Sequence, residues 1–575
     1  MQVFHKYNGF INIYKEAGWT SMDVCAKLKH VLGVRKIGHA GTLDPMAEGV
    51  LPVALGRATK DIDKVGSCVK EYTAGMLLGT ETDTEDISGK VLKTYEGELP
   101  SEAEVREAVM SFVGEYDQLT PMYSARKVNG RKLYQYARAG IEVERKTKHV
   151  EIYGITIDEI NLPHVTFTVR CSQGTYVRSL CRDIGEKLCC GACMDKLTRN
   201  QVGRFVLNDA VRIAEVENLE QAGGIDAWLS ISAPTAVSIG KFDGTHIGHQ
   251  ALFRELRKKA EAEHLRTLVI ILKFGKSGVL SDADRKQRLY ELGIDYVVEL
   301  EFNEEMRNMS AEDFLEKILI GRYNMHAIVA GKDVSFGKGK AGNAEFLKAN
   351  AAKYGYSVDL IDKILAESPD KGDNVLNGQI ASSTLLRKLI AEGDMARVAE
   401  LLGTPYTLSG PVIHGKGIGK SEMQYPTMNI EVSDDLILPP YGVYAVRACI
   451  YQENVKGGQP RRESNAAGDE NLKPDTETVV NRQGQKSQAV PAVREVKGIA
   501  NLGERPTVHG SVEGGTRLRL EVHSFDEIGD VYGAKVRVEL LKFIRPEHKF
   551  DSIAELVTRI TEHDIPETRD FFGLS

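Results

Sequence analysis

The sequence contains little cysteine and no long hydrophobic run. Eight cysteines among 575 residues are too few for a disulfide scaffold, so we expect reduced thiols and a cytoplasmic protein. No apolar run approaches the roughly 18 to 20 residues that a membrane-spanning helix requires. Residues 1–15 lack the basic and apolar regions of a secretory signal. We therefore expect neither membrane association nor secretion.

The charge balance excludes a protein with a strongly basic coat for nucleic acid. There are 74 Lys and Arg residues against 81 Asp and Glu residues, which gives a net charge of −7. A local basic patch remains compatible with this total. The composition, with 42% hydrophobic and 27% charged residues, is typical of a globular protein, and the length predicts roughly three or four domains.

The pattern of hydrophobic residues changes twice along the chain. Residues 10–215 mix short β-rich runs with amphipathic helical stretches, which is typical of an α+β domain. From 234 to 362, apolar strands alternate with polar helical segments, and this alternation predicts a parallel sheet in an α/β, Rossmann-like fold. From 404 onward, short β-runs with Gly/Pro turns and a helix near 553–562 predict a small antiparallel β-barrel.

The same changes of pattern predict the domain boundaries. We place the three domains at residues 1–229, 233–402 and 404–575. A polar stretch at 452–488, rich in Gly, Asn, Glu and Gln, cannot bury enough apolar surface to offset the entropy lost on ordering it. We predict that this stretch is a disordered insertion between two barrel strands.

The most specific motif of the first domain surrounds Asp44. Glycines and small residues at 38–42 and 47–49 allow close approach of a ligand to the backbone beside this carboxylate, although Asp-Pro in such a loop is by itself more typical of a turn. Together with Lys70-Glu71-Tyr72 and the run Cys171 to Arg178, the motif resembles the tRNA pseudouridine-55 synthases over residues 8–207.

That resemblance implies an isomerase that converts uridine to pseudouridine in the TΨC loop (position 55) of tRNA, with no cofactor. Asp44 would be the essential carboxylate and Arg178 its partner, while Tyr72 would stack on the uracil. His39 would help to fill the space that the flipped base leaves, and Tyr176 would contact the substrate. A protein that only binds tRNA, such as an RNA chaperone, is the alternative.

Basic and aromatic residues are interleaved between 121 and 150. Cations with tyrosines suit phosphate pairing and base stacking, although a solvated helix face has the same composition. Beside Tyr123, Tyr134 and Tyr136 and only two glutamates, the segment contains eight basic residues: Arg126, Lys127, Arg131, Lys132, Arg138, Arg145, Lys146 and Lys148.

In the second domain an apolar strand at 236–240 runs into Lys241-Phe242-Asp243-Gly244-Thr245-His246-Ile247-Gly248-His249. A strand-to-helix turn with two histidines suits nucleotidyl transfer, because the helix N-terminus favours a phosphate. The motif resembles the FMN adenylyltransferase half of bifunctional riboflavin kinase/FAD synthetases. The resemblance implies that His246 and His249 act at the α-phosphate of ATP. It implies nucleotide contacts for Gly240, Phe242, Asp243, Gly244, Gly248, Ser382, Ser383, Thr384 and Arg387.

Two segments depart from that family. Leu272 to Ser277 stands where Thr-Phe-x-Pro-His-Pro is usual, and Gly331 to Gly337 differs in the Gly-x-Asp-Phe-x-Phe-Gly segment. A riboflavin kinase with a degenerate adenylyltransferase therefore remains an alternative.

The third domain contains a glycine-rich segment at 415–421 that does not fit a P-loop, because position 414 is His where that motif requires Gly. With Pro426-Thr427-Met428-Asn429 and the strand around Glu521, it resembles riboflavin kinases. The resemblance implies a flap containing Gly415 and Gly417, Mg²⁺ and ATP bound through Thr427 and Asn429, and Glu521 as general base. Met428 replaces the family's Ala and is expected to face the core.

The sequence thus predicts a fusion of a tRNA-modifying isomerase with a module that makes FMN and FAD from riboflavin and ATP. The two activities share no substrate. We therefore expect genetic linkage rather than channelling, and no protein partner.

Overall fold

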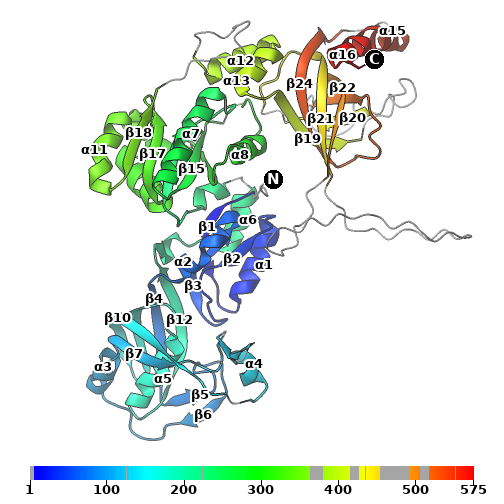
Figure 1. The fold of residues 1–575 in the computed structure, drawn as a ribbon. Helices are drawn as coiled ribbons and strands as arrows, with labels where there is room; N and C mark the ends of the chain where they lie inside the picture. The colour runs from blue at the N-terminus through cyan, green and yellow to red at the C-terminus, as the bar shows by residue number, and fades with distance from the viewer. Residues whose placement is uncertain are drawn as a thin grey trace, which may run out of the picture.

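Three domains with different folds follow one another in the computed structural model. Figure 1 shows the first in blue to teal, the second in green and the third in yellow to red. Within the described part of the chain, no helix is long and apolar enough to cross a membrane. The described residues are 6–124, 126–128, 130–141, 143–221, 224–275, 278–362, 380–414, 427–433, 436–452, 492–505, 517–548, 550 and 552–574.

A nine-stranded sheet forms the first domain, in the order β1-β3-β12-β4-β11-β10-β7, with β2 beside β3 and β13 beside β12. Only the β3/β12 pair of this sheet is parallel. The predicted α+β class is confirmed. The strands are β1 (Gly9–Lys15), β2 (Ile37–His39), β3 (Glu48–Leu55), β4 (Lys70–Leu78), β7 (Gly114–Leu119), β10 (Thr147–Asn161), β11 (His164–Cys171), β12 (Ala192–Val202) and β13 (Phe205–Val206).

Helices cover this sheet with their apolar residues. Val105 of α3 and Leu180 of α5 lie in one buried cluster with β4 and β11, whereas Leu28 of α1 and Val216 of α6 pack in another cluster with β1 and β3. Thr20 begins α1 with a capping box that it forms with Asp23. The helices are α1 (Ser21–Val31), α2 (Ile62–Gly66), α3 (Glu102–Met110), α4 (Leu133–Arg138), α5 (Val177–Lys187) and α6 (Ile213–Gln221), and the short 3-10 helix η3 (Ile225–Trp228) follows.

The second domain is a five-stranded parallel sheet in the order β16-β15-β14-β17-β18, as the alternation of strands and helices predicts. Its three central strands are almost continuously buried because helices cover both faces. The strands are β14 (Thr235–Gly240), β15 (Arg266–Lys273), β16 (Tyr296–Glu301), β17 (Met325–Gly331) and β18 (Ser357–Ile361). Its helices include α7 (Ile247–Ala262), α8 (Asp282–Glu291), α9 (Glu304–Asn308), α12 (Ser383–Glu392) and α13 (Met395–Leu402).

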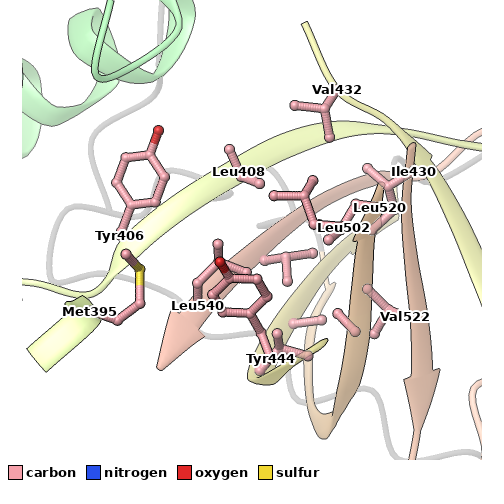
Figure 2. Packing of buried hydrophobic residues seen from close by; sticks show 14 of the residues in the cluster. Met395, Tyr406, Leu408, Ile430, Val432, Tyr444, Leu502, Leu520, Val522 and Leu540 are labelled. Carbon is pink, nitrogen blue, oxygen red and sulfur yellow. The ribbon is translucent and has the colours of Figure 1, made fainter. Parts of the chain in front are cut away.

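The third domain is a closed barrel in the order β19-β20-β23-β22-β21-β24, which confirms the barrel prediction. β24 pairs with β19 and closes the ring. Figure 2 shows the interior, where alternate residues of neighbouring strands such as Ile430, Leu520 and Val522 pack together. The strands are β19 (Tyr406–Ile413), β20 (Thr427–Glu431), β21 (Gly442–Gln452), β22 (Ala492–Arg505), β23 (Arg517–Ser524) and β24 (Lys535–Pro546), followed by the helices α15 (Ile553–Arg559) and α16 (Ile565–Phe571).

Two expectations about this barrel have different outcomes. Met428 is fully buried in the core, as expected from its position in the motif. Gln452 at the end of β21 pairs with Ala492 at the start of β22, so the insertion predicted at 452–488 joins two neighbouring strands. Apart from Gln452 itself, the insertion lies outside the described residues.

The close contact between β3 and β12 predicts how a substitution at Gly49 changes the stability of the first domain. Gly49 has a φ of +105°, and a Cβ at this position would lie 2.4 Å from the backbone oxygen of Arg199. We expect Gly49→Ala to lower the free energy of unfolding of this domain by roughly 2–4 kcal/mol, through left-handed strain plus overpacking. Gly18→Ala is the matched control, because its φ is +88° and nothing lies within 4 Å. It should lose only about 1–2 kcal/mol. Urea unfolding followed by tryptophan fluorescence measures both, and equal losses would contradict the packing argument.

Candidate active sites

The first site is built around a buried arginine shared by two carboxylates. Arg178, in the first turn of α5, places its Nε 3.0 Å from Asp44 Oδ2 and its Nη1 3.2 Å from Asp86 Oδ2. Its remaining N–H groups donate to the carbonyl oxygens of Thr84 and Tyr123. The Arg178 and Asp86 side chains are 6% and 5% exposed, whereas that of Asp44 is 35% exposed. Asp44 is therefore the member of this group that a ligand can reach.

A second buried arginine holds the loop that contains Asp44. Arg199 on β12 is fully buried and donates from Nη2 to the Gly41 carbonyl at 3.0 Å and from Nε to the Val50 carbonyl at 2.7 Å. Tyr72 on β4 lies opposite Arg199 in the ladder and is also buried. Burial raises the pKa of Tyr72, so its phenol stays protonated near neutral pH. Arg199 thus links the loop that contains Asp44 to the strand that contains Tyr72.

Lys15 and His39 complete the surroundings of the loop. The fully buried Lys15 ammonium donates to the carbonyl oxygens of Pro45 and Ala47, at 3.3 and 2.5 Å. Burial lowers its pKa to about 8. His39 on β2 is half-buried, and its Nδ1 has no hydrogen-bond partner among the described residues. Burial lowers the pKa of His39, with a further contribution from Arg199, so the imidazole is neutral at neutral pH.

The electrostatics of Asp44 combine two opposing effects. Burial raises the pKa of this carboxyl above its ordinary value, and the Arg178 guanidinium opposes that rise. The charge of Asp86 raises the pKa of the same carboxyl, and the charge of Lys15 lowers it. Burial prevails, so the carboxylate is less well stabilised than an exposed aspartate.

Tyr176 and the basic segment lie next to this group. The Tyr176 backbone is fixed at the start of α5 by Gln118, which accepts from the Tyr176 N–H at 2.8 Å and donates to its carbonyl at 3.0 Å. In the basic segment, Lys132 and Arg138 place cations 5.7 and 5.4 Å from the ring centre of Tyr134 on α4. This combination of an aromatic ring with two cations suits stacking bases and phosphates.

The second site forms where two distant segments meet at the carboxyl edge of the parallel sheet. Asp243, after β14, accepts from Arg387 of α12 through Nη2 at 2.6 Å and Nε at 3.1 Å. Ser383 donates to the Asp243 carbonyl at 3.0 Å. Phe242 and Thr245 both have positive φ, of 46° and 47°, and Gly244 lies between them with a φ of 82°. Such backbone conformations persist only where the surroundings fix them, and they concentrate at functional sites.

The two histidines of this site stack on each other at the start of α7. The ring centres of His246 and His249 lie 3.8 Å apart, and both Nδ1 atoms are buried without a hydrogen-bond partner in the described ranges. Burial lowers the pKa of His246 to about 4 and that of His249 well below its ordinary value. Both rings are therefore neutral at neutral pH. Gly248 lies against the His246 ring, Ser382 begins α12 as its N-cap, and Thr384 is exposed in the first turn of that helix.

Aromatic side chains mark the same edge of the sheet. Phe274 follows β15 and Phe302 follows β16, with ring centres 4.7 Å apart, and Phe274 is 43% exposed. The Lys241 ammonium, after β14, lies 4.3 Å from the ring centre of Phe274. Each of these residues directly follows one of three adjacent parallel strands, where ligands bind in sheets of this kind.

The third site lies on the outer face of two barrel strands. Because Met428, Leu520 and Val522 point into the core, Thr427, Asn429, Glu521 and His523 alternate onto the other face. Asn429 is directly opposite Glu521, and Thr427 Oγ1 lies 3.3 Å from His523 Nδ1. Gly415 and Gly417 lie outside the described residues.

Four residues of these sites were missed by sequence reasoning. Arg199 and Lys15 gave no signal, because each is a single polar residue in a strand pattern. His523 lies in the strand motif around Glu521 but was assigned no role. Asp86 lies in the acidic run 81–86, and only its contact with Arg178 distinguishes it from its neighbours.

Family models match four consecutive parts of the chain. "TruB family pseudouridylate synthase (N terminal domain)" matches residues 29–177, and "tRNA pseudouridylate synthase B C-terminal domain" matches 178–228. "FAD synthetase" matches 229–371 and "Riboflavin kinase" matches 402–572.

Curated relatives cover the first domain. The tRNA pseudouridine synthase B of Clostridium tetani is 47% identical over 216 residues, which are 37% of this chain and 75% of the relative. That of Alkaliphilus oremlandii is 49% identical over 218 residues, which are 38% of this chain and 73% of the relative. Among solved structures, a Cbf5-Nop10-Gar1 complex is 31% identical over 38% of this chain and 57% of that chain. Its TM-score of 0.31 is too low to bear on the fold.

The raised pKa of Asp44 predicts a pH-dependent effect on stability. A carboxyl whose pKa is raised by folding favours the folded state below its unfolded pKa, and this contribution is lost as the pH rises through the folded pKa. We expect Asp44→Asn to increase the free energy of unfolding at pH 7, and the increase should disappear near pH 4. Urea unfolding between pH 4 and 8 measures it. The exposed Asp117→Asn controls for the loss of a charge, and a decrease for Asp44→Asn at pH 7 would show that pairing with Arg178 outweighs burial.

Proposed function

Because the chain belongs to the tRNA pseudouridine synthase B family, we propose that its first domain converts uridine 55 in the TΨC loop of tRNA to pseudouridine. The main support for this proposal is the position of the Asp44 carboxylate, which lies 3.0 Å from a buried arginine and is still partly exposed. The reaction breaks the bond between the ribose and N1 of the base and rejoins the ribose to C5 of the same base. It therefore needs an anionic group beside the ribose and a pocket that holds the detached base.

The side chains around Asp44 divide these tasks. Arg178 keeps the carboxylate oriented, and its second contact with Asp86 keeps the guanidinium in place when Asp44 engages the substrate. Tyr72 stacks on the uracil, and Tyr176 contacts it from the start of α5. His39, neutral and with an unpaired ring nitrogen, fills the space that the flipped nucleotide leaves. The cations and tyrosines of residues 126–148 contact the tRNA backbone and bases.

The chain is also an ATP-dependent flavin enzyme, since it contains FAD synthetase and riboflavin kinase domains. We propose that the third domain phosphorylates riboflavin to FMN and that the second adenylylates FMN to FAD. In the first step Glu521 accepts the proton of the ribityl hydroxyl that attacks the γ-phosphorus of ATP. In the second, a phosphate oxygen of FMN attacks the α-phosphorus of ATP and pyrophosphate leaves.

The second site contains groups suited to both substrates of adenylylation. The neutral rings of His246 and His249 lie at the N-terminus of α7, where the helix favours the α-phosphate. Arg387 neutralises charge on the nucleotide phosphates. The exposed ring of Phe274, in contact with the tilted ring of Phe302, offers an aromatic surface for the flavin ring although its segment departs from the family sequence.

A Mg²⁺ ion fits the donor atoms of the third site. Hydroxyl, amide and carboxylate oxygens are the ligands that Mg²⁺ prefers, and it usually keeps substrate phosphates among its ligands. In the described ranges no three His, Cys, Asp or Glu residues cluster as a metal site, so the ion would rely on Thr427, Asn429 and ATP. When bound, it would neutralise charge on the phosphates.

Substitution of Asp44 tests the isomerase. We expect Asp44→Asn to lower the rate of pseudouridine formation on unmodified tRNA by about 10³-fold, because the amide is uncharged. Arg178 keeps its contact with Asp86, so tRNA affinity should stay within about twofold, which fluorescence anisotropy can measure. Asp117→Asn is the control variant. Equal product formation by wild type and Asp44→Asn would remove Asp44 from its role.

Product analysis tests the flavin half. With riboflavin, ATP and Mg²⁺, we expect both FMN and FAD. Glu521→Gln should slow FMN formation about 10²–10⁴-fold and still convert supplied FMN to FAD. His246→Gln should make FMN and little FAD. If the wild type makes FMN without FAD, the second domain is a degenerate adenylyltransferase and the adenylylation proposal fails.

A further inference from the structure

Helix α8 of the second domain contacts both other domains. Figure 1 shows α8 beside the barrel and close to the N-terminal part of the first domain. Ser281 begins the helix as its N-cap, and Lys286 and Tyr290, four residues apart, lie on one face. Both side chains are buried, which is unusual for a lysine unless it is paired.

The first domain supplies the partners for this face of α8. Lys286 Nζ lies 2.5 Å from Asp226 Oδ2, and Asp226 belongs to η3 at the end of the first domain. Asn8, just before β1, donates to the Tyr290 hydroxyl at 2.7 Å. Glu299 on β16 is the second carboxylate beside Lys286, at 3.1 Å. The interface thus takes residues from both ends of the first domain.

A second group of contacts extends the interface along β16. Arg57 Nη1 lies 3.3 Å from Asp295 Oδ1, directly before the strand. The Tyr296 hydroxyl donates to Asp61 Oδ2 at 3.3 Å. Arg57 also lies over the Tyr290 ring, 5.6 Å from its centre. These contacts pair groups of the first domain with the second domain over one continuous region.

Burial makes the ionic part of this interface energetically important. The side chains of Asp226, Lys286 and Glu299 are 7%, 11% and 8% exposed. Burial lowers the pKa of Lys286, but Asp226 and Glu299 together raise it above its ordinary value. Removing one partner of a buried ion pair leaves a charge without compensation, which is strongly destabilising. The penalty therefore applies to a substitution that removes the Asp226 charge while Lys286 stays buried in the interface.

The second and third domains are joined by a shared core. Leu386 of α12, Leu401 of α13 and Val279, two residues before Ser281, lie in the same hydrophobic cluster as the barrel interior. The Ile437 N–H of the third domain donates to the Gly278 carbonyl at 2.8 Å. The Val279 N–H donates to Asp243 Oδ1 in the second site, at 2.7 Å.

We propose that α8 and the segment before it make the three domains one cooperative folding unit, so that nucleotide bound in the flavin half stabilises the tRNA-modifying half. A ligand that binds only the folded state stabilises every part that unfolds with its site. By the same argument, tRNA bound to the first domain should stabilise the flavin half. The surface of α8 and β16 takes the first domain of the same chain as its partner, and the fusion therefore has a physical consequence beyond genetic linkage.

The two tryptophans, Trp19 and Trp228, both lie in the first domain, which provides a selective probe. In the full-length Trp228→Phe protein, Trp19 alone reports unfolding of that domain. We expect Mg·ADP, whose binding is first measured by calorimetry, to raise the midpoint of the Trp19 thermal transition. Hydrogen exchange should show a matching increase in the opening free energy of β21 and β24 when Mg·ADP is bound. Asp226→Asn should abolish the rise of the Trp19 midpoint. The exposed Asp117→Asn should keep it.

An unchanged Trp19 midpoint alongside a stabilised barrel would overturn the proposal. If Mg·ADP binds to neither flavin site, the nucleotide-binding proposal fails and the coupling is tested without ligand. Hydrogen exchange in urea should then give β1 and β16 the same opening free energy in the wild type and different ones in Asp226→Asn. Tyr290→Phe removes one interdomain hydrogen bond with little change of shape. If Asp226→Asn does not fold, Tyr290→Phe replaces it in this experiment. Different opening free energies in the wild type would also refute cooperativity.

Discussion

The buried cations Arg178 and Lys286 are each held by acceptors from separate segments, and this constraint fixes much of the functional geometry. Arg178 is held by Asp44 and Asp86, which lie on different loops. Lys286 is held by carboxylates of two domains. Because an unpaired buried charge is so unfavourable, each cation determines how the segments around it must be arranged. The same groups that hold the fold together therefore also place the reactive carboxylate.

The surrounding secondary structure brings these partners into range. Strand alternation places Thr427 and Asn429 on one barrel face and Met428 in the core. The parallel sheet of the second domain gathers the residues that follow β14, β15 and β16 at one edge. His246 and His249, whose Nδ1 atoms have no hydrogen-bond partner in the described part of the chain, lie at the start of α7 after the first of these strands. Each site thus combines a rigid strand or helix start with loop residues that a ligand can reach.

Much of the architecture was predictable because it depends on local periodicity. Alternating strands and helices fix a parallel sheet, and short β-runs with Gly/Pro turns fix a barrel, wherever the side chains lie in detail. The motif around Asp44, the His246 and His249 pair and the strand with Glu521 were found through their resemblance to known families, which short runs of adjacent residues are enough to show. Asp86, Arg199 and His523 were not, because their importance depends on contacts with residues far away in the chain.

The three folds and their order could be read from hydrophobic periodicity, which is a property of adjacent residues, and the motifs from their resemblance to known families. The contacts of the folded chain were needed to show that Arg178 is shared by two carboxylates and that Asp243 holds Arg387 across about 140 residues of chain. They also show that Asp226 pairs with Lys286 across a predicted domain boundary. The reason is physical: pairing of buried charges depends on distance in space, which no local pattern of residues encodes.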